Sequence, residues 1–130
     1  MLQLAQTHPH IVGYIGRGSH DDQSLLFMEH VPGGDLLDRV LNKAALPDEE
    51  ASRVLLQLLM AVEHLHEQKG IAHGDLKPEN MLCTAGPKES RVDVKLADFG
   101  ASSSLRDTQL EGSEWAAWAT ATGTASYSAP

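Results

Sequence analysis

The chain has 130 residues, enough for one domain, and 42% of them are hydrophobic, so a packed core can form. Its formal net charge is -8 and its Lys and Arg residues form no cluster, which disfavours a nucleic-acid partner and attachment to a membrane. Cys83 is the only cysteine, and no run of 18 apolar residues occurs. We therefore expect a soluble protein of a reducing compartment, the cytoplasm or the nucleus.

Short elements are predicted for the first third of the chain. Residues 1–7 resemble the end of a helix, because the proline that follows cannot continue it. Residues 11–15 and 24–31 are rich in strand-forming residues and flank a polar turn at 16–22, which predicts a hairpin. After a Pro-Gly-Gly break, Asp35 is placed to cap a short helix.

The clearest helical pattern covers residues 47–69. Pro47 and three acidic residues suit a helix start, and Lys69 followed by Gly70 suits its end. Between them, the spacing of apolar residues predicts one buried face made of Ala51, Val54, Leu55, Leu58, Val62 and Leu65.

The second half of the chain is predicted to hold a second hairpin and a long loop. Residues 71–80 show no regular period, and residues 81–84 and 92–97 are apolar runs on either side of a polar segment. From residue 101 onward, Ser, Thr, Ala and Gly dominate without a period, which predicts a long loop of the functional or disordered kind.

Three motifs occur in the second half, and their order is informative. His73-Gly74-Asp75-Leu76-Lys77-Pro78-Glu79-Asn80 follows the long helix, Asp98-Phe99-Gly100 follows the second hairpin, and Gly123-Thr124-Ala125-Ser126-Tyr127-Ser128-Ala129-Pro130 comes last. A single short motif is frequent by chance, whereas three in this order are specific. Together they resemble the catalytic loop, the metal-binding motif and the end of the activation segment of eukaryotic serine/threonine protein kinases.

The resemblance implies a partial protein-kinase-like fold of the α+β class. Residues 1–31 would be a remnant of the N-lobe with the hinge, and residues 32–130 an incomplete C-lobe. The implied reaction transfers the γ-phosphate of ATP to a Ser or Thr of a protein substrate, with Mg²⁺ as the metal. Among kinases, the catalytic loop and hinge resemble the calcium/calmodulin-dependent group most.

The resemblance also assigns the catalytic and metal-binding residues. Asp75 would accept the proton of the substrate hydroxyl, and Lys77 would hold the γ-phosphate. Thr124 would bond to both and order the site. Asn80 and Asp98 would supply oxygen ligands to Mg²⁺, a hard cation that prefers them.

Residues 25–35 resemble the last N-lobe strand and the hinge that binds adenine. Met28 would be the gatekeeper, and the backbone of Glu29 and Val31 would bond to the adenine edge. Asp35 would reach the ribose, and Leu82 would form the floor of the pocket. The alternative for these positions is an ordinary strand, turn and helix cap, because contacts made by the backbone place little constraint on which side chains occur there.

The chain departs from the family at Gly74, where an arginine is usual. That arginine normally pairs with a phosphorylated residue of the activation segment, so this mode of activation is not implied here. His73 is expected to be structural, packing against Phe99.

The 130 residues include no Gly-rich phosphate loop, no lysine in a Val-Ala-Ile-Lys strand context and no large helical remainder of the C-lobe. We therefore expect the chain alone to be marginally folded and nearly inactive, with apolar side chains of the long helix left in water. A pseudokinase-like binding or scaffold module without catalysis is the alternative class. Retention of Asp75, Lys77, Asn80 and Asp98 together disfavours that alternative.

Overall fold

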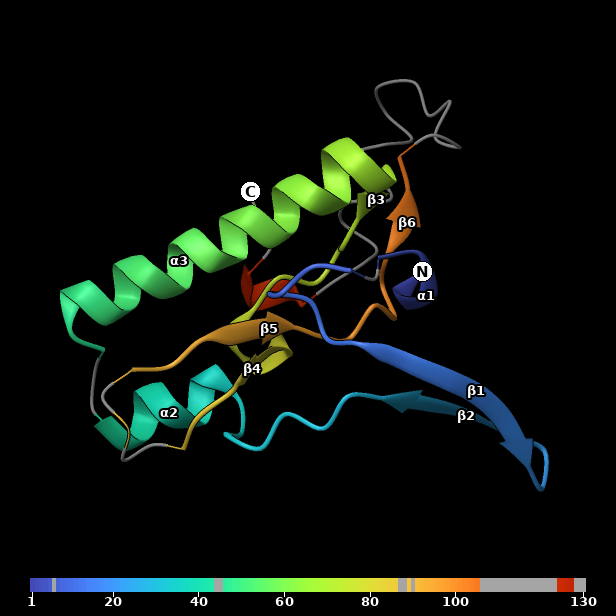
Figure 1. Ribbon diagram of the computed structural model, residues 1–130, viewed down its shortest axis with the longest axis horizontal. Helices are drawn as coiled ribbons and strands as arrows, with labels where there is room; N and C mark the ends of the chain where they lie inside the picture. Colours follow the sequence, from blue (N-terminus) through green and yellow to red (C-terminus); the bar gives the residue numbers. More distant parts are fainter. Residues whose placement is uncertain (6, 44–45, 87–88, 90, 106–123, 128–130) are drawn as a thin grey trace.

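The computed structural model describes residues 1–5, 7–43, 46–86, 89, 91–105 and 124–127. Figure 1 shows one long helix above two short hairpins, the first of which extends away from the helices. The elements in chain order are α1 (Leu2–Ala5), β1 (Tyr14–His20), β2 (Gln23–Met28), α2 (Leu36–Lys43), α3 (Asp48–Glu63), the π-helical turn η1 (His64–Lys69), β3 (Ile71–Ala72), the 3₁₀ turn η2 (Pro78–Asn80), β4 (Met81–Cys83), β5 (Val94–Leu96), β6 (Ser103–Ser104) and the 3₁₀ turn η3 (Ala125–Tyr127).

The first hairpin forms as predicted, but its turn is shorter than expected. The strands pair antiparallel down to His20 opposite Gln23, so the turn consists of Asp21 and Asp22 alone. Both turn residues have positive φ, 43° and 63°, as a tight two-residue hairpin turn requires. Residues 16–20 were predicted as turn because of their Gly and Ser content. That prediction is wrong, because cross-strand pairing holds them extended.

The two helices begin and end close to the predicted residues. Asp35 caps α2, since the backbone N–H of Asp38 donates to Asp35 Oδ1 at 2.8 Å. The long helix runs from Asp48 and continues through η1, and Gly70 ends it in the left-handed conformation with φ 63°. The helical prediction for residues 47–69 is therefore confirmed.

The buried face of α3 differs in part from the predicted one. Val54 and Leu65 are buried as expected, whereas Ala51 and Leu55 are exposed. Two polar residues take their places in the interior: Glu50 pairs with Arg39 at 2.7 Å, and Gln57 donates to Asp93 Oδ1 at 2.6 Å. Apolar periodicity misses such residues, because their burial depends on partners elsewhere in the chain.

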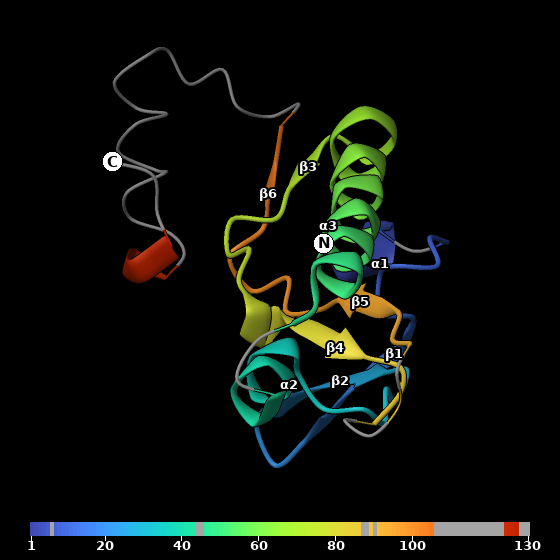
Figure 2. The same cartoon turned by 90° about the vertical axis from the view of Figure 1, so that its left-hand side faces the viewer.

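The second hairpin, β4 with β5, is confirmed and lies at the centre of the molecule. The segment before β1 runs alongside β5, where Val12 N–H donates to Leu96 O at 3.0 Å and Leu96 N–H to His10 O at 2.9 Å. In Figure 2, β3 and β6 lie side by side, and their register pairs Ile71 with Ser104. β6 was predicted as loop, because a two-residue strand carries no detectable period.

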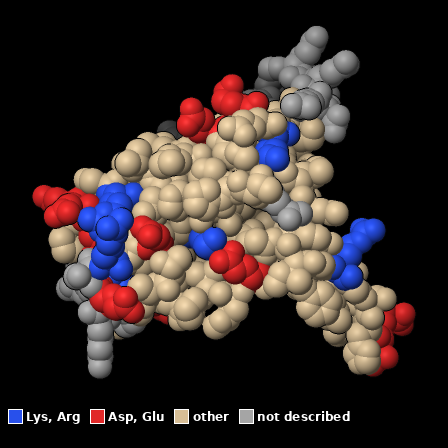
Figure 3. Space-filling view, in the orientation of Figure 1, with Lys and Arg blue, Asp and Glu red and all other residues tan. Residues whose placement is uncertain are grey.

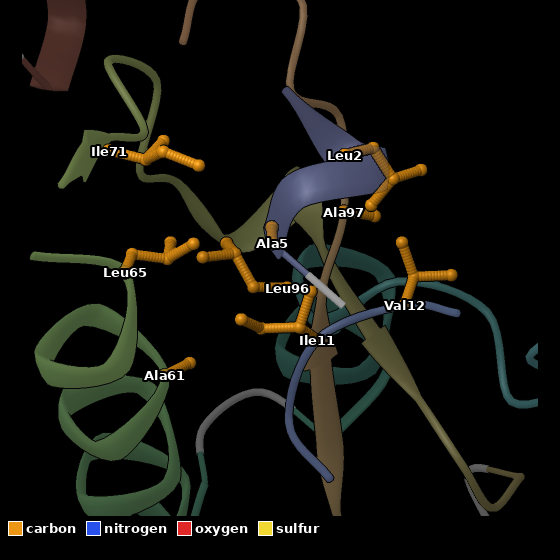
Figure 4. Close-up of a cluster of buried hydrophobic side chains, with 9 residues drawn as sticks. All are labelled: Leu2, Ala5, Ile11, Val12, Ala61, Leu65, Ile71, Leu96 and Ala97. Carbon is orange, nitrogen blue, oxygen red and sulfur yellow. The ribbon is translucent and has the colours of Figure 1, made fainter. Parts of the chain in front are cut away.

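Two hydrophobic clusters meet at β5. Figure 4 shows the first, formed by Leu2, Ala5, Ile11, Val12, Ala61, Leu65, Ile71, Leu96 and Ala97. The second consists of Leu36, Val54, Met81, Cys83, Val92 and Val94. On the opposite face of α3, Leu55, Leu56 and Leu59 are more than half exposed, at 55%, 58% and 56%. None of the helices among the described residues is long and apolar enough to cross a bilayer.

Candidate active site

The loop between β3 and β4 carries the first motif and is anchored by His73. His73 is buried, and its ring meets the edge of Phe99 with centroids 4.9 Å apart, which confirms the expected structural packing. Asp75 N–H donates to His73 Nδ1 at 3.3 Å, so Nε2 carries the proton and donates to Ala97 O at 3.0 Å. Burial lowers the pKa of His73, which favours this neutral form.

Both carboxylate oxygens of Asp75 are held in place. Lys77 Nζ lies 2.8 Å from Oδ2, and Asn80 Nδ2 donates to Oδ2 at 3.0 Å and to the Asp75 backbone oxygen at 2.8 Å. Thr124 Oγ1 donates to Oδ1 at 2.7 Å. The Lys77 ammonium, followed by the Thr124 hydroxyl, lowers the pKa of Asp75 to about 2. The carboxylate is therefore charged at neutral pH and can accept a hydrogen bond from a substrate hydroxyl.

Thr124 also connects the last described segment, residues 124–127, to the loop that carries Asp75 and Lys77. Lys77 Nζ donates to Thr124 Oγ1 at 2.6 Å, so Thr124 bonds to both charged partners at once. The contact with the Asp75 carboxylate raises the pKa of Lys77. The structure thus brings together all four residues assigned to catalysis. Gly123 and residues 128–130 of the same motif lie outside the described residues.

A cavity of about 570 Å³ opens between the first hairpin and the β4 strand. Met28 from β2 and Leu82 from β4 line it, together with Asn80 and Asp98. Its lining is mainly apolar with a few polar groups, as is common for small-molecule sites. Four of the residues assigned to nucleotide or metal therefore face one cavity.

Three other residues assigned to the nucleotide are not among those that line the cavity. The Glu29 backbone N–H donates to Gly13 O at 2.8 Å, and its carboxylate faces Lys95. The Asp35 carboxylate caps α2. Val31 packs against the first hydrophobic cluster. The structure does not bring these three positions to the cavity, so their assignments stay predictions.

Asn80 and Asp98 offer oxygen atoms suited to a magnesium ion. The amide nitrogen of Asn80 is used by Asp75, so its carbonyl oxygen is the atom that can bind a cation. Asp98 is exposed and has φ 58°, a conformation uncommon for a residue with a side chain and enriched at functional sites. Within the described ranges, no group of three or more His, Cys, Asp or Glu could hold a metal by itself. Such a two-ligand site suits Mg²⁺ bound with phosphate and water.

The fold leaves no room for a side chain at Gly74, which the sequence alone does not reveal. Its φ is 83°, and a Cβ added there would lie 2.4 Å from the Ala101 carbonyl oxygen. Any side chain at this position would force the backbone of residues 74 or 101 to move. The glycine in place of the usual arginine therefore fits the close approach of the two loops.

Sequence reasoning missed several residues around the cavity. Tyr14, Arg17 and Glu79 line it, although none was assigned a role. Tyr14 and Arg17 are three positions apart and face the cavity together only because the strand pairing is irregular between Tyr14 and Gly16, which no sequence pattern indicates. Glu79 lay within the first motif, next to Asn80.

Comparison with known proteins identifies the family. The family described as "Protein kinase domain" matches residues 1–130, and the chain belongs to this family. It is 37% identical over 123 residues to calcium/calmodulin-dependent protein kinase type 1 of Macrobrachium nipponense, covering 95% of this chain and 32% of that protein. It is also 37% identical over 123 residues to the carbon catabolite-derepressing protein kinase of Secale cereale, covering 95% of this chain and 22% of that protein.

A third relative is a probable myosin light chain kinase of Dictyostelium discoideum, 37% identical over 124 residues, with 95% of this chain and 23% of that protein covered. The chain thus spans between about a fifth and a third of these relatives. The resemblance to serine/threonine kinases, including the calcium/calmodulin-dependent group, is confirmed. The α+β protein-kinase-like fold is confirmed with it.

Proposed function

We propose that the protein carrying this chain is a serine/threonine protein kinase that transfers the γ-phosphate of ATP to protein substrates. The observation that carries the proposal is the hydrogen-bonded arrangement of Asp75, Lys77 and Thr124. Asn80 donates to Asp75 and connects this arrangement to the cavity that Asn80 and Asp98 line. Phosphoryl transfer depends on positioning and on charge stabilisation, and these residues provide both. ATP and a protein substrate are the proposed partners, in the cytoplasm or nucleus.

Each residue has a defined part in the proposed reaction. The ionised Asp75 orients the substrate hydroxyl and accepts its proton, while the Lys77 ammonium neutralises charge on the transferred phosphoryl group. Asn80 and Asp98 would hold Mg²⁺, which neutralises phosphate charge when bound. Residues 1–31 would contribute the N-lobe wall and hinge, and residues 32–130 the C-lobe part of the site.

The test is phosphoryl transfer by the longest natural polypeptide that contains this sequence. With Mg²⁺ and γ-labelled ATP, it should phosphorylate a mixture of Ser- and Thr-containing peptides. Asp75→Asn should reduce kcat about 10²- to 10⁴-fold, because the group that accepts the proton is lost. Asp22→Asn, the same change in the hairpin turn, is the matched control and should retain activity.

The alternative class predicts a different result in the same assay. A non-catalytic binding module would show no phosphoryl transfer above the background of the Asp75→Asn variant, whether or not it binds nucleotide. That outcome would refute the kinase proposal.

A further inference from the structure

The side chain of Glu29 makes contacts that its proposed backbone role does not use. Glu29 follows Met28, which lines the cavity, at the point where β2 becomes the hinge segment. Its Oε2 accepts the backbone N–H of Gly13 at 3.0 Å, and its own N–H donates to Gly13 O at 2.8 Å. The hinge is therefore bonded in both directions to the segment that precedes β1.

The same carboxylate oxygen also pairs with Lys95 on β5. Lys95 Nζ lies 3.1 Å from Glu29 Oε2, and the side chains are 18% and 39% exposed, respectively. In Figure 3 a basic and an acidic group adjoin in the middle of the face, where β5 runs in Figure 1. Lys95 is the register partner of Leu82, which lines the cavity. The ion pair thus connects the hinge to the hairpin that forms the cavity floor.

Gly13 permits this junction by having no side chain. A Cβ at position 13 would lie 3.2 Å from Glu29 Oε2, closer than side chains normally pack. The residues just before Gly13 are themselves hydrogen-bonded to β5 through Val12 and Leu96. Three segments therefore meet at one carboxylate: residues 10–13, the hinge and β5.

The surroundings of the Glu29 carboxylate favour its charged form. Burial alone would raise the pKa of Glu29, but the Gly13 N–H and the Lys95 ammonium outweigh it and hold the pKa below its ordinary value. The hydrogen bonds from the Gly13 N–H and the Lys95 ammonium to Glu29 Oε2 are both charge-assisted, because the acceptor is ionised. Neither Glu29 nor Lys95 is among the residues that line the cavity, so any effect on a ligand passes through their neighbours.

We propose that Glu29, Lys95 and Gly13 form a brace behind the cavity that fixes the distance between the hinge and the Leu82 floor. Glu29 and Lys95 are positioning residues for the adenine nucleotide, and the brace sets nucleotide affinity rather than the rate of transfer. The reason is preorganisation: a cavity that already has the width of its bound state loses less conformational freedom when a planar base binds. This inference rests on the proposed function, because it assumes that the cavity binds ATP.

The test compares single and reversed charges in the natural full-length protein. Glu29→Gln and Lys95→Met should each raise the KM for ATP and the Kd for Mg·ADP by about 3- to 10-fold. Lys95→Met should leave kcat within about twofold of the wild type. The reversed pair, Glu29→Lys with Lys95→Glu, should recover part of the loss, and Gly13→Ala should weaken affinity in the same direction. Glu49→Gln removes the exposed pair with Arg53 on α3 and serves as the control.

The outcomes separate this inference from the proposed function. If the wild type binds Mg·ADP and transfers phosphate but the Glu29 and Lys95 variants bind equally well, the brace is overturned and the kinase proposal stands. Variants that lose thermal stability with KM and kcat unchanged would also overturn it, because the contacts would then be merely structural. A wild type that binds no nucleotide overturns both.

Discussion

Thr124 offers the sharpest test of how the proposed catalytic residues work together. Its hydroxyl donates to Asp75 Oδ1 at 2.7 Å and accepts from Lys77 Nζ at 2.6 Å, and the two residues lie 49 and 47 positions away in the chain. Thr124→Val keeps the shape of the side chain and removes both bonds. Thr124→Ser keeps the hydroxyl and removes only a methyl group, which makes it the matched control.

The expected magnitude follows from the bond to the Asp75 carboxylate alone. Lys77 still has the Asp75 carboxylate at 2.8 Å after the substitution, so we assign no separate loss to it. A hydrogen bond to a charged group contributes about 1.5–3 kcal/mol. If the bond is needed to orient Asp75 in the transition state, Thr124→Val should lower kcat/KM by about 10- to 150-fold.

The assay is steady-state peptide phosphorylation by the natural full-length protein at saturating Mg²⁺. Thr124→Ser should stay within about threefold of the wild type, because both hydrogen bonds can form. Equal activity of the Val variant and the wild type would refute the reasoning, since Asp75 would then be oriented without Thr124. Equal loss in the Ser and Val variants would refute it as well, because the methyl group would be responsible.

Three further predictions concern stability, each measured on the natural full-length protein. Burial lowers the pKa of His73. As the pH falls below about 6.5, the unfolded chain therefore binds a proton that the folded chain does not. The Tm should fall as the pH is lowered from 7.5 to 5.5, and it should fall less steeply for His73→Gln. Gly74→Ala should lower Tm more than Gly34→Ala. A side chain at either position costs about 1–2 kcal/mol because φ is positive, but only the Cβ at position 74 would also meet a carbonyl oxygen. Equal shifts in Tm would contradict the close approach of Gly74 to that oxygen. Arg39→Met should cost about 3–5 kcal/mol in urea unfolding because it removes the charged partner of the buried Glu50 carboxylate, and adding Glu50→Leu should recover most of the loss. No recovery would show that the hydrogen bonds from Arg39 to the Gly86 and Glu89 backbone oxygens matter more.

Most of the proposed catalytic residues could be assigned from sequence because the motif that carries them is continuous in the chain. Asp75, Lys77 and Asn80 lie within six positions, so one short loop fixes their relative placement. Thr124 could be assigned only by resemblance, since the sequence between Asn80 and Thr124 carries no pattern that predicts their proximity. Thr124 contacts Asp75 and Lys77, and its role in catalysis stays a prediction.

The hinge was less predictable, because its proposed contacts belong to the backbone. The side chains of Glu29 and Asp35 have other partners, a lysine on a distant strand and a helix end. No periodicity could reveal the pairing of Glu29 with Lys95, which lies 66 positions later and depends on the register of β4 with β5. Similarly, the burial of Glu50 depends on Arg39 and is invisible to a search for apolar faces.

The uncovered apolar row on α3 has a consequence for the handling of the isolated chain. Leu55, Leu56, Leu59 and the 42%-exposed Met60 would drive copies to associate in solution unless charge opposes them. At neutral pH the net charge of -8 supplies that repulsion, but it vanishes near the isoelectric point of about 5.2. Residues 1–130 should therefore be most dispersed in weakly alkaline buffer at low salt, and should precipitate as the buffer approaches pH 5 or the salt concentration screens the charge.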